Sequence, residues 1–174
     1  MGTCDLPVSA GTAEHPDVLL ERLISAHGDK LLRYCHSILL DYHEAQDVVQ
    51  ATFIKAYAKV SARNAGATHG AWLYRAAYTG CMDILRRKKI QRLFFGEKAE
   101  EGVYTQEYFI SDSVKQTLLQ LSPKDRALVF SRAVEGYDFS DLETVYGVSA
   151  QTLRKRYERA RRKLAKIILE EGFS

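Results

Sequence analysis

The sequence predicts an all-α protein of two small helical modules, an N-terminal helical bundle and a C-terminal helix-turn-helix bundle, joined by an acidic linker. Apolar residues recur every three to four positions along most of the chain, which is typical of helices with one buried face. Residues 93–112 break this period and contain five acidic residues and one lysine. The sequence shows no strand pattern, and a chain of 174 residues is long enough for two small modules.

The N-terminal module is predicted to span residues 18–92, after a flexible leader at residues 1–17 that is rich in glycine, proline and small polar residues. Short connections between its helices favour a bundle in which each helix buries the apolar face of its neighbours. We expect three helices, at residues 18–40, 44–60 and 71–92.

The C-terminal module is predicted to span residues 114–171, after the linker at residues 93–113. Within it, Ser122, Pro123 and Asp125 have the spacing of a helix start, with serine as the N-cap, proline in the first helical position and an acid in the third. This helix is expected to end where a glutamate and a glycine follow one another, at residues 135–136.

The end of the chain has the pattern of a DNA-binding helix-turn-helix. A short helix is predicted at residues 139–146, followed by the turn residue Gly147 and by Ser149 as the N-cap of a final helix. Residues 148–166 contain eight arginines and lysines and one acid, while apolar residues recur at helical spacing beneath them. A helix that is apolar on one side and cationic on the other fits the recognition helix of this motif.

Such a helix contacts base edges with its N-terminal residues and phosphates with the cations further along. The alternative is a solvated cationic face, which the excess of cations over acids makes the weaker interpretation. The candidate DNA contacts are Ser149, Gln151, Thr152, Arg154, Lys155, Arg156, Arg159, Arg162 and Lys163.

Composition limits the other classes of function. The net charge is +3, but 13 of the 25 lysines and arginines lie in two runs, residues 86–92 and 154–166, which suits a phosphate backbone. No segment approaches the roughly 20 apolar residues of a membrane span, and the N-terminus lacks the apolar core of a signal peptide. We therefore expect a cytoplasmic protein with no membrane insertion.

The sequence shows no catalytic constellation, so we expect neither an enzyme nor a bound cofactor. Three scattered cysteines do not form a disulfide framework and fit a reducing compartment. Cys35, His36, His43 and Cys81 are conceivable metal ligands, but no Cys-x-x-Cys pair is present. Packing of small buried residues is the stronger interpretation of both cysteines.

Three motifs resemble the extracytoplasmic-function (ECF) family of bacterial RNA polymerase sigma factors. Residues 47–53, DVVQATF, are similar to D-L-V-Q-E-T-F in region 2 of that family. Residues 71–77, AWLYRAA, followed by DILRR at residues 83–87, resemble a second region 2 motif. In region 4, the resemblance is carried by residues 121–126, 135–136, 147–149, 152 and 159–161.

The sequence departs from the family pattern at a few positions. Ala51 replaces a usual acid, and Tyr78 and Thr79 stand where the family usually has Arg-Asn near the melted promoter strand. Tyr157 and Glu158 are unusual within the recognition helix.

The resemblance implies an alternative sigma factor that binds bacterial core RNA polymerase and promoter DNA, and that is commonly held by an anti-sigma factor. The C-terminal module would read the −35 duplex, and the third helix with its preceding loop would meet the melted −10 element. Polymerase would bind the outer face of the second helix through Asp47, Gln50 and the exposed apolar Ile54. The −10 candidates are Arg63, Asn64, His69, Tyr74, Arg75, Tyr78, Arg86, Arg87 and Lys88.

Two alternatives remain at this stage. The first is a stand-alone helix-turn-helix transcriptional regulator whose N-terminal bundle dimerises or senses a ligand. The second is a small metal or thiol enzyme, which rests only on the scattered cysteines and histidines.

Overall fold

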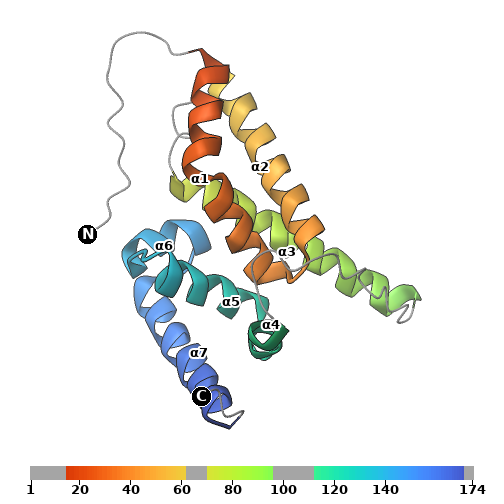
Figure 1. Cartoon of the computed structure of the whole chain (residues 1–174), viewed down its shortest axis with the longest axis vertical. Helices are drawn as coiled ribbons and strands as arrows, with labels where there is room; N and C mark the ends of the chain where they lie inside the picture. The colour runs from red at the N-terminus through yellow and green to blue at the C-terminus, as the bar shows by residue number, and fades with distance from the viewer. Residues whose placement is uncertain (1–14, 62–69, 96–111, 171–174) are drawn as a thin grey trace.

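The structure, a computed structural model, describes residues 15–61, 70–95 and 112–170, and within these ranges every regular secondary-structure element is a helix. The predicted all-α fold of two helical modules is confirmed (Figure 1). The elements are α1 (Pro16–Leu39), α2 (Tyr42–Ser61), α3 (Gly70–Phe95), α4 (Asp112–Leu119), α5 (Pro123–Val129), the π-helical turn η2 (Phe130–Val134), α6 (Phe139–Tyr146) and α7 (Ala150–Glu170).

The N-terminal module is a three-helix bundle in which α1, α2 and α3 contact one another. The predicted break between the first two helices is a tight corner. Leu40 takes a left-handed conformation, with φ of 57°, and its N–H donates to the carbonyl of His36 at the end of α1. Asp41 then accepts a hydrogen bond from the N–H of Glu44 at 2.9 Å and caps α2. This corner turns α2 back along α1 (Figure 1).

Helices α2 and α3 approach closely at Gly80. A Cβ atom built on Gly80 would lie 3.1 Å from Cγ1 of Val48, which is 5% exposed in the bundle core. The absence of a side chain at this position therefore sets how near α3 lies to α2.

The C-terminal module begins as the sequence predicts. The Ser122 side chain accepts a hydrogen bond from the N–H of Asp125, which confirms the N-cap of α5. The helix does not continue uniformly, because the N–H of Glu135 bonds to the carbonyl of Phe130 and opens the last turn into η2. Gly147, with φ of 65°, closes α6 and leads into α7. Helix α7 then contacts α4, α5 and α6.

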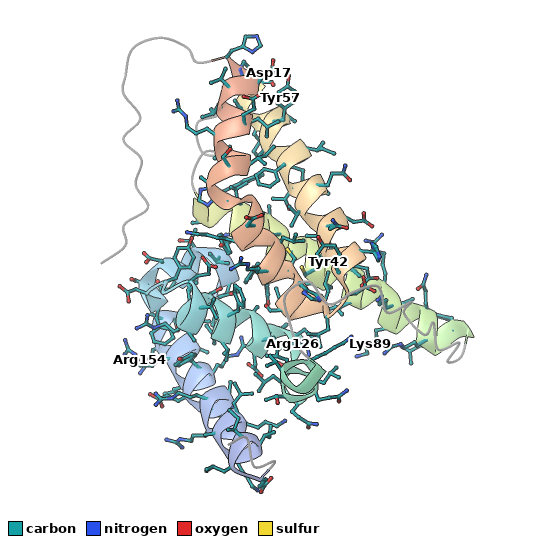
Figure 2. The ribbon with its side chains drawn as sticks, viewed as in Figure 1. Asp17, Tyr42, Tyr57, Lys89, Arg126 and Arg154 are labelled. Atoms are coloured by element: carbon teal, nitrogen blue, oxygen red, sulfur yellow. The ribbon has the colours of Figure 1, made fainter. Side chains whose placement is uncertain are left out.

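The two modules pack against each other through α1 with α5 and η2, and through α3 with α6. Most of the buried apolar residues consequently form one cluster that extends from Leu23 in α1 to Leu153 in α7. Arg126, which is 6% exposed, lies where α5 meets the end of α1 (Figure 2). The sequence did not predict this docking.

Three predicted boundaries differ from the observed helices. Helix α1 begins at Pro16, inside the predicted leader, and α3 extends to Phe95, three residues beyond the predicted end of the first module at residue 92. Helix α4 begins at Asp112, so the last residues of the predicted linker belong to a helix. Helical spacing locates the middle of an element better than its ends.

Replacing Gly80 with leucine should lower the free energy of unfolding by about 1–3 kcal/mol, because the new side chain must displace Val48 from a packed core. Thermal or urea unfolding followed by circular dichroism measures the change. Gly28→Ala in α1 is the comparison, since its Cβ would meet only Ile24 at 3.7 Å and should raise stability by about 0.5–1 kcal/mol. Wild-type stability of the Gly80 variant would contradict the close approach.

Candidate nucleic-acid and polymerase interfaces

Helix α7 presents a cationic surface to solvent. Leu153 and Ala160 are buried on its inner side, while Glu158 is the one acid that the outer surface carries between residues 150 and 166. Figure 2 shows Arg154 at the edge of the C-terminal module, directed away from the other helices. The predicted DNA contacts that are exposed in the structure are Ser149, Gln151, Thr152, Arg154, Lys155, Arg159, Arg162 and Lys163.

The first turn of α7 is held by side chains on both sides of the Gly147 turn. Ser149 Oγ lies 3.0 Å from Thr152 Oγ1 and accepts a hydrogen bond from the N–H of Thr152. The Glu143 carboxylate of α6 accepts a hydrogen bond from the N–H of Ala150. Sequence analysis missed Glu143, because an acid seven residues away is not a local capping pattern. The first turn of α7 is therefore fixed to α6.

Three of the α7 cations that were predicted to contact DNA make contacts within the protein. The Arg154 guanidinium lies 5.5 Å from the ring centroid of Phe139, and Lys163 Nζ donates to the carbonyl of Gln120. Arg156 forms an ion pair with Asp125 at 3.1 Å, with side-chain exposures of 21% and 30%. Arg156 was predicted to contact the DNA backbone, and in this conformation one nitrogen of its guanidinium, Nη2, is paired with α5.

The predicted −10 contacts in the first half of α3 are covered by the C-terminal module. Tyr74 is 1% exposed, and its ring lies 5.4 Å from that of Tyr137. The half-buried Tyr78 packs edge-on against Tyr146 at 4.8 Å. Arg75 is exposed but donates to a backbone carbonyl of α6, that of Thr144, at 3.1 Å. In this conformation Tyr74 cannot stack on a base. Arg63, Asn64 and His69 lie outside the described residues.

The second half of α3 extends away from the other helices and carries the remaining −10 candidates (Figure 1). Arg86 pairs with Asp83 at 2.7 Å, and Arg87 donates to the carbonyl of the same residue. Lys88 pairs with Glu44 of α2 at 2.7 Å. Figure 2 shows that Lys89 is directed outward from this extension. Arg86 and Arg87 are exposed, so phosphates can reach them.

The predicted polymerase face borders an apolar groove between α1 and α2. Asp47 and Gln50 are exposed, and Ile54 is 65% exposed. Gln50 and Ile54 line an open groove of about 530 Å³ that reaches Ile24 in α1 and Tyr57 at the far end of α2. Sequence analysis identified three residues of this surface and missed the groove, because its second wall comes from α1.

The cysteines and histidines do not form a metal site in the part of the chain that the structure describes. Cys35 and Cys81 are free and fully buried, and the hydrogen bond between them, together with burial, raises the pKa of the Cys35 thiol. The described residues contain no group of three potential ligands among histidine, cysteine and acidic side chains. In the same residues, no helix combines the length and apolarity that crossing a bilayer requires.

Comparison with known proteins identifies the family. Residues 23–90 match the Sigma-70 region 2 family, and residues 111–164 match the Sigma-70, region 4 family. The RNA polymerase sigma-H factor of Pseudomonas aeruginosa is 31% identical over 186 residues, covering 90% of this chain and 95% of the relative. The ECF RNA polymerase sigma factor SigW of Bacillus subtilis is 24% identical over 160 residues, covering 83% and 86%. The chain belongs to the ECF sigma factors.

Solved ECF-type structures have the same fold. CnrH, in complex with the cytosolic domain of CnrY, superposes with a TM-score of 0.66 at 22% identity over 93% of this chain and 94% of that one. RpoE of Bartonella quintana, in complex with the anti-sigma factor NepR, gives 0.70 at 22% over 85% and 95%. As an ECF sigma factor, the chain has alternative sigma factor activity in promoter-specific transcription initiation. Sigma factors are DNA-binding regulatory proteins, and the resemblance seen in the motifs is confirmed.

Arg156 and Arg162 of this sigma factor should respond differently to replacement by glutamine. Arg156→Gln removes the partly buried pair with Asp125 and should lower the free energy of unfolding by roughly 0.5–1 kcal/mol, a shift of about 1–4 °C in Tm. Arg162→Gln should leave Tm unchanged and reduce the salt dependence of promoter binding by about one unit of slope. Melting curves and salt titrations measure both effects, and the opposite pattern would contradict this division of roles.

Proposed function

We propose that α7 reads the −35 duplex, that α3 binds the melted −10 strand, and that the outer face of α2 binds core RNA polymerase. The predicted modules at residues 18–92 and 114–171 then act on successive promoter elements while both are carried by the enzyme. The observation that supports this most directly is the exposed cationic side of α7. The first turn of this helix is fixed, and its outer side chains are exposed and can contact the major groove of DNA.

The first turn of α7 has the side chains that direct readout requires. Gln151, Arg154 and Lys155 are exposed, and a glutamine pairs with adenine while arginine or lysine pairs with guanine in the major groove. Arg159 and Arg162 follow on the same exposed helix and are suited to phosphates, which carry no sequence information but fix the register.

Each promoter contact is weak on its own, and attachment to polymerase raises the effective concentration of the second contact. The groove beside Gln50 and Ile54 supports binding of a protein partner, since an exposed apolar patch with a polar rim is typical of such surfaces. CnrH and RpoE were solved with CnrY and with the anti-sigma factor NepR, and we propose that this chain also has an anti-sigma partner. We place the protein in the cytoplasm, with its polymerase.

Ile54→Glu should weaken binding to core polymerase about tenfold, or ~1.4 kcal/mol, because a charge replaces an apolar contact in the interface. Co-elution of each variant with core polymerase, with no inhibitor bound, measures the binding. Run-off transcription by core polymerase, with and without the chain, measures the activity. Leu169→Glu is the matched control, since Leu169 is also strongly exposed but lies at the end of α7.

Tight binding of the free chain to a palindromic duplex, without polymerase, would support the stand-alone regulator instead. Specific run-off transcripts that need both components support the sigma factor mechanism. Equal binding of the Ile54 and Leu169 variants would show that polymerase binds elsewhere.

Gln151→Ala should reduce discrimination at one base pair of the −35 element by about 1–3 kcal/mol, because a bidentate contact is lost. Selection of −35 sequences from a random library by the assembled holoenzyme measures this as a relaxed preference at one position. Affinity for unrelated DNA should not change, because the phosphate contacts remain. An unaltered preference would remove Gln151 from the reading surface.

A further inference from the structure

Two buried cysteines meet between α1 and α3 in the N-terminal bundle. Cys35 of α1 and Cys81 of α3 are both 0% exposed, and a hydrogen bond joins their thiol groups. The proposed function uses neither residue, and in the described parts of the chain they belong to no group of three potential metal ligands. Two thiols in contact have a chemistry of their own, which is oxidation to a disulfide.

The geometry of the pair suits a disulfide. Two cysteines can be bridged only when their side chains point toward each other, because the S–S bond is about 2.05 Å long. Helices α1 and α3 contact each other, and the hydrogen bond shows that the two thiol groups already meet. Formation of the bond therefore needs the sulfur atoms to approach further, and it does not need either helix to turn.

The surroundings of the pair decide which thiol reacts first. The hydrogen bond with Cys81 and burial raise the pKa of the Cys35 thiol well above its ordinary value, so Cys35 stays protonated at neutral pH. The thiolate is the nucleophile in thiol oxidation. We therefore expect Cys81 to react with the oxidant, and Cys35 to react with the product.

Burial also limits which oxidants can reach the pair. Tyr34 and Tyr74, whose rings lie 5.0 Å apart in the core, are close enough to Cys35 to interact with it electrostatically. A bulky or charged reagent cannot enter such a packed interior. Hydrogen peroxide is little larger than water, so a brief local opening of the bundle admits it.

We propose that Cys35 and Cys81 form a peroxide-sensitive dithiol, which a small peroxide converts into a disulfide that links α1 to α3. In the first step, the Cys81 sulfur attacks one oxygen of hydrogen peroxide, the O–O bond breaks, and Cys81 becomes a sulfenic acid as one water is released. In the second step, the Cys35 sulfur attacks the Cys81 sulfur, and the departing hydroxide takes the Cys35 proton and leaves as a second water. The pair loses two electrons and two hydrogen atoms, and the peroxide is reduced to water.

The disulfide is a cross-link inside the N-terminal bundle. It closes a loop that contains the whole of α2, and closing a loop lowers the conformational entropy of the unfolded chain. Neither cysteine lines the groove between α1 and α2 or lies on α7. Oxidation is therefore expected to stabilise the bundle while both of these surfaces remain exposed.

The direct test is oxidation of the folded full chain carrying Cys4→Ser, which leaves Cys35 and Cys81 as its two cysteines. After treatment with hydrogen peroxide, we expect intact mass spectrometry to show the loss of two hydrogen atoms and peptide mapping to locate a Cys35–Cys81 disulfide. Dithiothreitol should restore both thiols. Two free thiols after a treatment that oxidises the unfolded chain, or disulfides that link separate chains, would overturn the inference.

Two reagents test the order and the selectivity of the reaction in the same Cys4→Ser chain. Dimedone, which traps sulfenic acids, should label Cys81 when it is added together with the peroxide, and a label on Cys35 would overturn the assigned order. Ellman's reagent, which is bulky and charged, should react with neither thiol until the chain is unfolded. Its reaction with the folded chain would overturn the selectivity for a small oxidant.

Thermal unfolding measures the effect of the cross-link. We expect the Tm of the oxidised Cys4→Ser chain to exceed that of the reduced chain by about 5–10 °C, because the closed loop constrains the unfolded state. The matched control adds Cys35→Ala and Cys81→Ala, so that peroxide can still oxidise methionine but cannot form a disulfide, and its Tm should not rise. A fall in Tm on formation of the disulfide would show that the bundle does not accommodate the bond. If the control does not fold, the mass measurement on the Cys4→Ser chain decides alone.

Discussion

The buried guanidinium of Arg126 fixes how the two modules lie against each other. A helix leaves its last carbonyl groups without partners, and the ends of α1 and α4 both direct such groups at Arg126. Hydrogen bonds from a charged donor are strong, but burial also lowers the pKa of Arg126 by opposing its charged form. The contact is favourable only when the carbonyls of Ile38, Leu118 and Leu121 are all in place. These hydrogen bonds therefore favour one arrangement of the modules, and they would not stabilise contacts between the modules in other arrangements.

The boundary between the modules differs chemically from the core of each. Leu31 and Leu73, both fully buried, fill the N-terminal bundle with aliphatic groups that cannot form hydrogen bonds and whose exposure to water is unfavourable. The boundary is formed by tyrosines such as Tyr34 and Tyr146, which combine a large apolar ring with a hydroxyl that water also satisfies. The hydroxyl groups of Tyr34 and Tyr146 therefore give the boundary a directional contact that aliphatic side chains cannot provide.

Local signals predicted most of the fold, and long-range contacts account for what was missed. The Ser122 cap, the Gly147 turn and the cationic side of α7 each depend on neighbours within a few residues, so their patterns are visible in sequence. Tyr34 and Tyr146 are 112 positions apart, and no periodicity links them. No local pattern marks Arg126 as buried, because its burial depends on the position of the end of α1, 88 residues away. The strand-binding candidates were chosen by residue type, which cannot reveal that another module covers them.

The docking of the modules affects the two proposed DNA surfaces differently. Arg154 on α7 and Lys89 on the extension of α3 lie on opposite sides of the molecule (Figure 2), so both cationic surfaces stay open to phosphates while the aromatic face between them is covered. Under the proposed function, contacts of duplex DNA with α7 need no change in the modules, whereas contacts of a melted strand with Tyr74 and Tyr78 would need α3 to separate from α6. The groove that we propose for core polymerase is lined by residues of α1 and α2, whereas Tyr74 and Tyr78 of α3 contact the C-terminal module, so a partner in the groove does not need either tyrosine.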